Sequence, residues 1–209
     1  MIKIVNFPFC NISSVLRCLD NLGVDFSVLN NSSEINSDDI VVLPGVGTFQ
    51  EGMNFLRQNG YVPALTNHAL SEGRIIGICL GMQLLLSRSE ESPCVSGLSL
   101  IPGACSQLPA CNDFLVPHIG WNSISHNPLC TDSFAFLGSE SSSLYSSKDF
   151  YFVHSYVACA ENQSSEMFYF DHPRGRMVAA LCNSNTVGFQ FHPEKSGPAG
   201  YELLLRFLR

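Results

Sequence analysis

The sequence has few charged residues and little basic charge. Only 14% of its 209 residues are charged, and 11 Lys and Arg against 18 Asp and Glu give a formal charge of −7. Nucleic-acid binding needs a Lys/Arg-rich surface, so this composition argues against a nucleic-acid partner. No apolar run approaches the roughly 18 residues of a membrane helix, and the N-terminal run is too short for a secretory signal. We therefore expect a cytoplasmic protein with no membrane partner.

The nine cysteines are dispersed and form no C-x-x-C pair. Such pairs build zinc sites and thioredoxin-like redox sites, so we expect neither a metal nor another cofactor. An odd number of cysteines in a chain without a secretory signal indicates free thiols. Most free cysteines are small buried hydrophobic residues, and only Cys79 lies in a sequence that suggests more.

The N-terminal part of the chain is expected to alternate between strands and helices. Short apolar runs indicate strands at 2–7, 26–29, 40–43 and 74–78. Apolar residues three or four apart indicate helices at 13–22, 48–56, 62–71 and 82–87. This alternation is typical of an α/β fold with a doubly wound, mainly parallel sheet and helices on both faces. The length fits a single domain over 1–209.

Beyond about residue 90 the composition and the pattern of apolar residues change. Turns rich in Ser, Pro, Cys and Asn separate short β-like segments, which we place at 98–101, 150–156, 167–170, 177–182 and 187–191. We expect these segments to form an antiparallel extension packed on the same core. A solvated loop is expected at 131–147 and a short amphipathic helix at 201–209.

Cys79 lies in a sequence that is typical of a nucleophile elbow. The segment Gly77-Ile78-Cys79-Leu80-Gly81 has the form G-x-nucleophile-x-G and follows the strand expected at 74–78. In such an elbow the reactive residue occupies a strained strand-to-helix turn, and the glycines avoid clashes where the backbone doubles back. Cys79 is therefore the predicted nucleophile.

The segment His192-Pro193-Glu194 offers a base for this thiol. Residues i and i+2 of an extended chain point to the same side, and proline favours extended geometry in the residue before it. The Glu194 carboxylate could therefore orient the His192 imidazole, which would take the thiol proton and later give it to the leaving group.

A third candidate element is the segment Leu43-Pro44-Gly45-Val46-Gly47, which ends the strand expected at 40–43. Its two glycines allow the peptide flip that an oxyanion hole can require, so its backbone N–H groups could lie near the elbow. An ordinary strand-ending turn is the alternative interpretation of this segment taken alone.

These segments resemble a known family. The Cys79 elbow, continued by Met82-Gln83, and the His192-Pro193-Glu194 segment resemble the class I, or triad-type, glutamine amidotransferases. Four stretches narrow the resemblance to the glutaminase subunit of imidazole glycerol phosphate synthase: LPGVGTF at 43–49, PHIGWN at 117–122, YFVHSY at 151–156 and GFQFHPEKS at 188–196.

The resemblance implies a function and a role for each matching residue. Glutamine would be hydrolysed to glutamate and ammonia by the triad Cys79, His192 and Glu194. The oxyanion would be held at Gly45, Val46 and Leu80. Glutamine would be bound by Gln83, Glu91, Ser155 and Tyr156. The ammonia would pass to a (β/α)₈-barrel cyclase subunit, bound as a heterodimer through Tyr151, Lys195 and Asn11, which makes imidazole glycerol phosphate in histidine biosynthesis.

The first loop departs from the family pattern. Family members commonly carry Tyr-Gly-x-Gly-Asn, whereas this chain has Phe7-Pro8-Phe9-Cys10-Asn11. Both glycine positions are filled, one of them by a proline that has no N–H to donate. The departure bears on the geometry of the loop and on the identity of the partner.

Four other functions remain open at this point. One is a paralogous glutaminase that supplies another synthase, such as a sugar-amidinating enzyme. Another is the glutaminase of vitamin B6 synthesis, a family that lacks the segment at 117–122. A catalytically silent regulatory subunit would be expected to lose a triad member, and a cysteine peptidase would not explain Gln83, Glu91 or the residues around His192.

Overall fold

A nine-stranded sheet forms the centre of this computed structural model, which describes residues 1–111, 114–130, 145 and 148–208. Five neighbouring strands are parallel, in the order β2 (Phe26–Leu29), β1 (Ile2–Val5), β3 (Ile40–Leu43), β4 (Arg74–Ile78) and β12 (Thr186–Phe189). Antiparallel strands continue the same sheet, in the order β11 (Gly175–Asn183), β10 (Glu166–His172), β7 (His118–His126) and β8 (Asp149–His154). The predicted parallel sheet with an antiparallel extension is confirmed.

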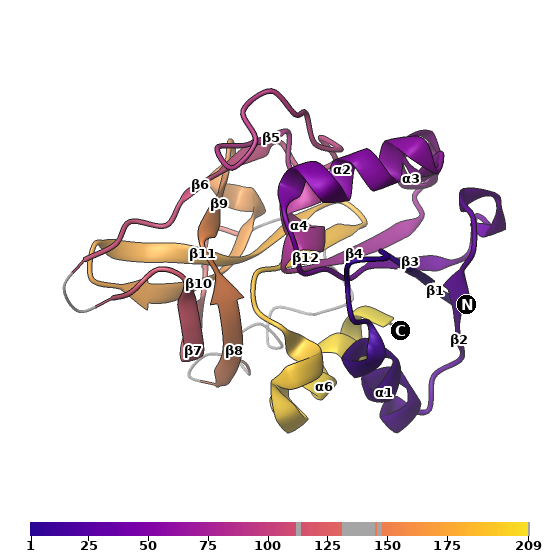
Figure 1. The fold of residues 1–209 in the computed structure, drawn as a ribbon. Helices are drawn as coiled ribbons and strands as arrows, with labels where there is room; N and C mark the ends of the chain where they lie inside the picture. Colours follow the sequence, from indigo (N-terminus) through magenta and orange to yellow (C-terminus); the bar gives the residue numbers. More distant parts are fainter. Residues whose placement is uncertain (112–113, 131–144, 146–147, 209) are drawn as a thin grey trace.

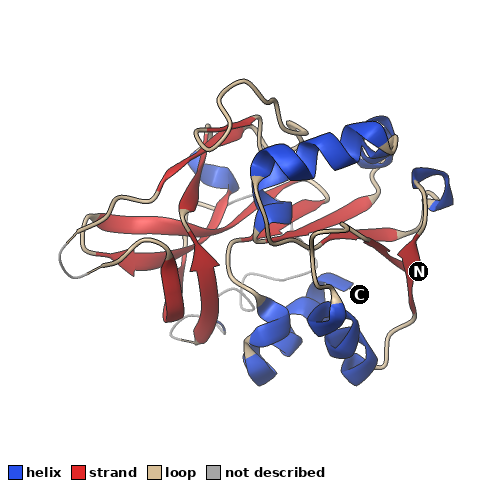
Figure 2. Ribbon diagram, viewed as in Figure 1, coloured by secondary structure: helices blue, strands red, loops and turns tan. Residues whose placement is uncertain are grey.

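Helices cover both faces of the parallel half, as predicted (Figures 1 and 2). One face carries α1 (Ser13–Leu22) and α6 (Gly197–Leu208), whose buried side chains share a core with the sheet. The other face carries α2 (Phe49–Gln58), α3 (Tyr61–Leu70) and α4 (Leu80–Leu85), which pack in a second core. The inner parallel strands β3, β4 and β12 are buried almost throughout, which explains why their sequences are mainly apolar, whereas the edge strand β2 is only partly buried.

Local signals define the ends of two helices near the site. Helix α1 stops at Gly23, whose φ of 63° is left-handed and whose N–H donates to the carbonyls of Leu19 and Asp20. Helix α2 begins after Thr48, which forms a capping box with Glu51. The cap at Thr48 therefore fixes where the loop after β3 turns at the carboxyl edge of the sheet, whereas Gly23 turns the chain back toward the start of β2.

A smaller three-stranded sheet consists of β5 (Arg88–Ser89), β6 (Gly103–Gln107) and β9 (Tyr156–Ala160). Strands β8 and β9 were expected as one segment at 150–156, but Ser155 interrupts it and the chain passes from the large sheet to the small one. Strands β6 and β7 were not predicted. Short 3-10 helices complete the described elements: η1 (Ser32–Glu34), η3 (Gln163–Ser165) and η4 (Pro193–Lys195).

Two predicted elements are wrong or displaced. The strand expected at 98–101 is absent from the described chain, because Leu98, Leu100 and Ile101 donate their N–H groups to carbonyls at the end of α4. The helix expected at 82–87 begins two residues earlier, at Leu80, because the turn at Cys79 leads directly into it. The remaining predicted strands and helices overlap the observed ones, and the terminal helix is longer than predicted.

The solvated loop expected at 131–147 lies outside the described residues except for Tyr145, which is buried. Among the helices that are described, none has both the length and the apolar character needed to span a membrane.

Candidate active site

Cys79 occupies the strained turn that the elbow motif predicts. Its backbone has φ 53° and ψ −107°, a conformation that costs free energy for a residue with a side chain, and it lies between β4 and α4. Its N–H donates to the carbonyl of Phe189 at 2.7 Å, which joins the elbow to β12. A Cβ at Gly81 would lie 1.8 Å from the carbonyl oxygen of Leu43, and one at Gly77 would lie 2.6 Å from the backbone of Gly81. Both glycines are therefore required.

His192 and Glu194 meet beside this turn. The Nδ1 atom of His192 lies 2.7 Å from Oε1 of Glu194, and both residues are buried, at 2% and 7% exposure. His192 is extended, as predicted, with φ −102° and ψ 92°. Glu194 is not in extended chain but in η4, which turns the carboxylate back onto the ring. The carboxylate thereby assigns the proton to Nδ1 and leaves Nε2 to face the thiol.

The electrostatics favour the charged form of the His192 imidazole. Burial lowers the pKa of His192, but the neighbouring Cys79 thiolate and the Glu194 carboxylate outweigh burial and raise this pKa to about 10. A second histidine near the pocket behaves differently, because burial lowers the pKa of His154 to about 3. His154 therefore stays neutral at physiological pH, and His192 is the base that this site provides.

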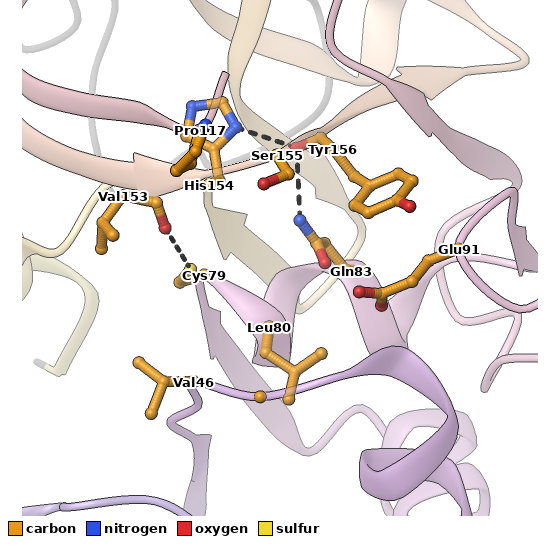
Figure 3. Close-up of a pocket in the computed structure, with 11 residues that line it drawn as sticks. Val46, Cys79, Leu80, Gln83, Glu91, Pro117, Val153, His154, Ser155 and Tyr156 are labelled. Carbon is orange, nitrogen blue, oxygen red and sulfur yellow. Dashed lines mark hydrogen bonds between the residues drawn. The ribbon is translucent and has the colours of Figure 1, made fainter. Parts of the chain in front are cut away.

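A cavity of about 240 Å³ opens in front of Cys79 (Figure 3). All four residues predicted to bind glutamine line it, together with Cys79, Val46 and Leu80. Sequence reasoning missed four further lining residues, namely Gly47, Pro117, Val153 and His154. All four lie inside the stretches that carried the family resemblance, so their place in these motifs was the available signal.

Several polar groups around the cavity already make hydrogen bonds within the protein. The Gln83 side-chain amide donates to the Tyr156 carbonyl at 3.3 Å (Figure 3). The Glu91 carboxylate accepts the N–H of Phe49 at 2.6 Å, at the first residue of α2. The thiol of Cys79 points to the Val153 carbonyl at 3.6 Å. Glu91 adds negative charge to one end of the cavity, where a substrate amino group would be attracted.

The predicted oxyanion donors are turned to other acceptors. The N–H of Leu80 donates to the Gly45 carbonyl at 3.3 Å. The N–H of Val46 contacts the Cys10 thiol, where it opposes the rise in the pKa of Cys10 that burial causes. An oxyanion formed at Cys79 would therefore find neither of these N–H groups free until the peptide between Gly45 and Val46 turns over.

Two of the three residues predicted to face a partner lie together on the surface. The ammonium group of Lys195 lies 6.0 Å from the centre of the Tyr151 ring, and Trp121 packs on that ring edge-on at 5.8 Å. Trp121 and Ile119, on β7, are 56% and 61% exposed. Asn11 is exposed and accepts the N–H of Ser13 at the start of α1. We call Ile119, Trp121, Tyr151 and Lys195 the docking face.

The main chain links the docking face to the triad. The N–H of His192 donates to the Tyr151 carbonyl at 2.8 Å. The Ser196 hydroxyl accepts the N–H of Tyr151 at 3.0 Å and donates to the His192 carbonyl at 2.6 Å. A movement of Tyr151 would thus be transmitted to the backbone of His192.

Comparison with known proteins identifies the family. The model of the class-I glutamine amidotransferases matches residues 4–209. The chain belongs to this family. It is 36% identical over 209 residues to the imidazole glycerol phosphate synthase subunit HisH of Chlorobaculum tepidum, covering 99% of this chain and 98% of the relative. The corresponding subunit of Methanopyrus kandleri is 37% identical, covering 97% of this chain and 94% of the relative.

Solved structures agree on the fold of this class-I glutamine amidotransferase. A crystal structure of a glutamine amidotransferase has a TM-score of 0.73 at 12% identity, covering 99% of this chain and 98% of the other. The structure of PurLQS from Thermotoga maritima has a TM-score of 0.73 at 17% identity, covering 99% and 96%. Within the described residues, no group of three or more His, Cys, Asp or Glu is placed to hold a metal ion.

The triad geometry of this amidotransferase predicts an order of mutational effects. We expect His192→Asn to lower the rate of glutamine hydrolysis by about 10²- to 10⁴-fold, because general-base activation contributes that much. Glu194→Gln should lower it less, since the carboxylate orients the ring and transfers no proton. Steady-state glutaminase assays measure both rates, with His126→Asn as the matched control outside the site. A Glu194→Gln enzyme slower than the His192→Asn enzyme would reverse the assigned roles.

Proposed function

We propose that this chain is the glutaminase subunit of imidazole glycerol phosphate synthase and acts in histidine biosynthesis. The observation that carries the proposal is a buried His192–Glu194 pair beside a strained Cys79, at a cavity lined by the residues expected to bind glutamine. The HisH names of relatives matched over almost the whole chain support the choice of synthase. Residues 1–209 act as one glutamine amidotransferase domain, which works in the cytoplasm without a cofactor.

The reacting form of the site has the proton of the Cys79 thiol on Nε2 of His192, in keeping with the raised pKa of this imidazole. The thiolate attacks the side-chain carbonyl carbon of glutamine, and the oxyanion formed is held by the N–H groups of Val46 and Leu80 once Gly45 has turned. The tetrahedral intermediate collapses as His192 gives its proton to the nitrogen, so that ammonia leaves and a γ-glutamyl thioester remains. Water, activated by the same imidazole, then releases glutamate and restores the thiol.

Glutamine is held by groups at the two ends of the cavity. Glu91 is placed to attract the substrate ammonium group, and Gln83 supports the wall formed by Ser155 and Tyr156. The cavity of about 240 Å³ is large enough for a small polar substrate such as glutamine.

The partner is a (β/α)₈-barrel cyclase subunit bound as a heterodimer on the docking face. The face combines exposed apolar side chains with one lysine, and large exposed aromatic residues next to a cation are typical of interface anchors. Asn11 lies at the start of α1 and would border the contact. The ammonia released at Cys79 would cross this face to the cyclase.

Binding to the cyclase from the same genome tests this proposal. We expect a one-to-one complex of the two purified chains in size-exclusion chromatography, and a weakening of about tenfold or more in titration calorimetry for Trp121→Ala. Leu70→Ala, which removes a still more exposed apolar side chain from α3, should bind as the native chain does. Absence of binding to the cyclase, with binding to another ammonia-dependent synthase, would assign the chain to the paralogous function instead.

A further inference from the structure

Gln190 is a buried polar residue next to the predicted nucleophile. It follows β12, whose register places Phe189 opposite Ile78, and the N–H of Cys79 donates to the Phe189 carbonyl. Alternate residues of a strand point to opposite faces, so Gln190 shares a face with Gly188, which lies against Met82 of α4. Its exposure is 0%. The parallel pairing of β12 with β4 therefore brings an amide to the elbow.

Two hydrogen bonds occupy the Gln190 amide. Its Oε1 accepts from Nε2 of Gln83 at 3.3 Å, and its Nε2 donates to Sγ of Cys79 at 3.9 Å. Gln83 also donates to the backbone carbonyl of Tyr156 at 3.3 Å. One side chain thus connects the wall of the glutamine cavity to the reacting sulfur atom.

The Tyr156 carbonyl fixes the orientation of the Gln83 amide and, through it, that of the Gln190 amide. A backbone carbonyl is only an acceptor, so the NH₂ group of Gln83 must point to Tyr156. That same NH₂ group faces Gln190, which must therefore present its oxygen to Gln83. The remaining NH₂ group of Gln190 is directed at Cys79.

A donor at this place favours the charged form of the sulfur. A thiolate is a much stronger hydrogen-bond acceptor than a thiol, so an N–H group aimed at it stabilises the ionised state. A fully buried amide costs free energy unless both of its ends are bonded, and an apolar side chain of the same size would pack here without that cost. The bonds to Gln83 and to Cys79 offset this cost.

We propose that Gln190 is a catalytic residue that stabilises the Cys79 thiolate and holds Gln83 against the substrate cavity. The inference rests on the proposed function, because it takes Cys79 as the nucleophile. Gln190 transfers no proton: His192 still receives the thiol proton, and the N–H group of Gln190 remains bonded to sulfur until sulfur binds the substrate carbon.

The pH dependence of Cys79 alkylation tests this role. Iodoacetamide reacts with the thiolate, so the rate of Cys79 modification, followed by peptide mass spectrometry across the pH range, reports its ionisation. The variant Gln190→Met keeps the length of the side chain but removes both hydrogen bonds. In this variant we expect the pH midpoint of Cys79 alkylation to rise by about one pH unit, which corresponds to a tenfold change in the ionisation constant. Glutamine turnover should fall about tenfold as well. Thr186→Val, at the other end of β12, should leave the midpoint unchanged.

The outcomes separate this inference from the proposed function. If alkylation of Cys79 leaves the native glutaminase active, the nucleophile itself is wrong. If alkylation inactivates the native enzyme but the pH profile of Cys79 alkylation is the same in Gln190→Met as in the native chain, the inference about Gln190 is wrong and Cys79 remains the nucleophile. If Gln190→Met does not fold, a pH titration of the native chain followed by NMR decides. The chemical shifts of the Gln190 side-chain amide protons should change at the same pH as the midpoint of the Cys79 alkylation profile. Resonances that do not move there overturn the inference.

Discussion

Replacing Cys79 with alanine is expected to abolish glutamine hydrolysis, with a loss on the order of 10⁴-fold or more, because no other group can form the thioester. Synthesis driven by added ammonia should persist in the complex with the synthase subunit. Ammonia made elsewhere bypasses Cys79 but still reaches the second active site. Paired assays with glutamine and with an ammonium salt measure the two activities.

The matched controls are Cys94→Ala and Cys159→Ala, since both thiols are exposed and lie outside the cavity. Each should retain native activity with either nitrogen source. If Cys79→Ala kept more than trace glutaminase activity, or if either control abolished it, the thiol at the elbow would not be the nucleophile.

The second large effect concerns activation by the partner. The isolated chain should be a poor glutaminase, because the N–H of Leu80 donates to the Gly45 carbonyl and the N–H of Val46 is turned to Cys10. Loss of one oxyanion donor typically costs about 10² to 10³ in rate, so a partner that turns this peptide should raise turnover by at least that factor. The partner would shift a population of conformations and supply no catalytic group.

Glutamine turnover should be measured for the isolated chain, for the chain with the synthase subunit, and for this complex with the substrate that accepts the ammonia. The increase should appear in kcat, because the oxyanion forms only after glutamine has bound. Gly45→Ala provides a matched variant: its Cβ would lie 3.0 Å from Cβ of Leu80, which hinders the turn without touching the triad. Equal rates under all three conditions would show that the Leu80 contact with Gly45 does not limit catalysis.

Local chemistry explains how far the sequence predicts this site. Gly77 and Gly81 mark the elbow because a Cβ at either position would collide with backbone, and a three-residue segment contains both His192 and Glu194. Strands 40–43 and 74–78 are predicted with their observed bounds because they are buried almost throughout, and the edge strand 26–29 is predicted equally well although it is only partly buried. Such features depend on neighbours in the sequence.

The missed features depend on distant parts of the chain. Strand β7 has polar and exposed residues and becomes a strand by pairing with β8 and β10. The segment 98–101 is apolar enough for a strand, but its N–H groups donate to carbonyls at the end of α4 and not to a neighbouring strand. Gln190 gains its contact with Cys79 only through the pairing of β12 with β4, and the direction of the Gly45–Val46 peptide is a property of the folded loop alone.

The most direct test of the central claim is to label the native chain with a diazoketone analogue of glutamine and map the modified peptide. In the cavity the diazo carbon of the analogue should be protonated and the Cys79 thiolate should displace dinitrogen from it, which leaves one covalent thioether adduct per chain. Glutaminase activity should fall in proportion to this adduct. Excess glutamine should protect the site. Modification of another cysteine, such as Cys10, or inactivation without an adduct on Cys79, would contradict a glutaminase built on this triad.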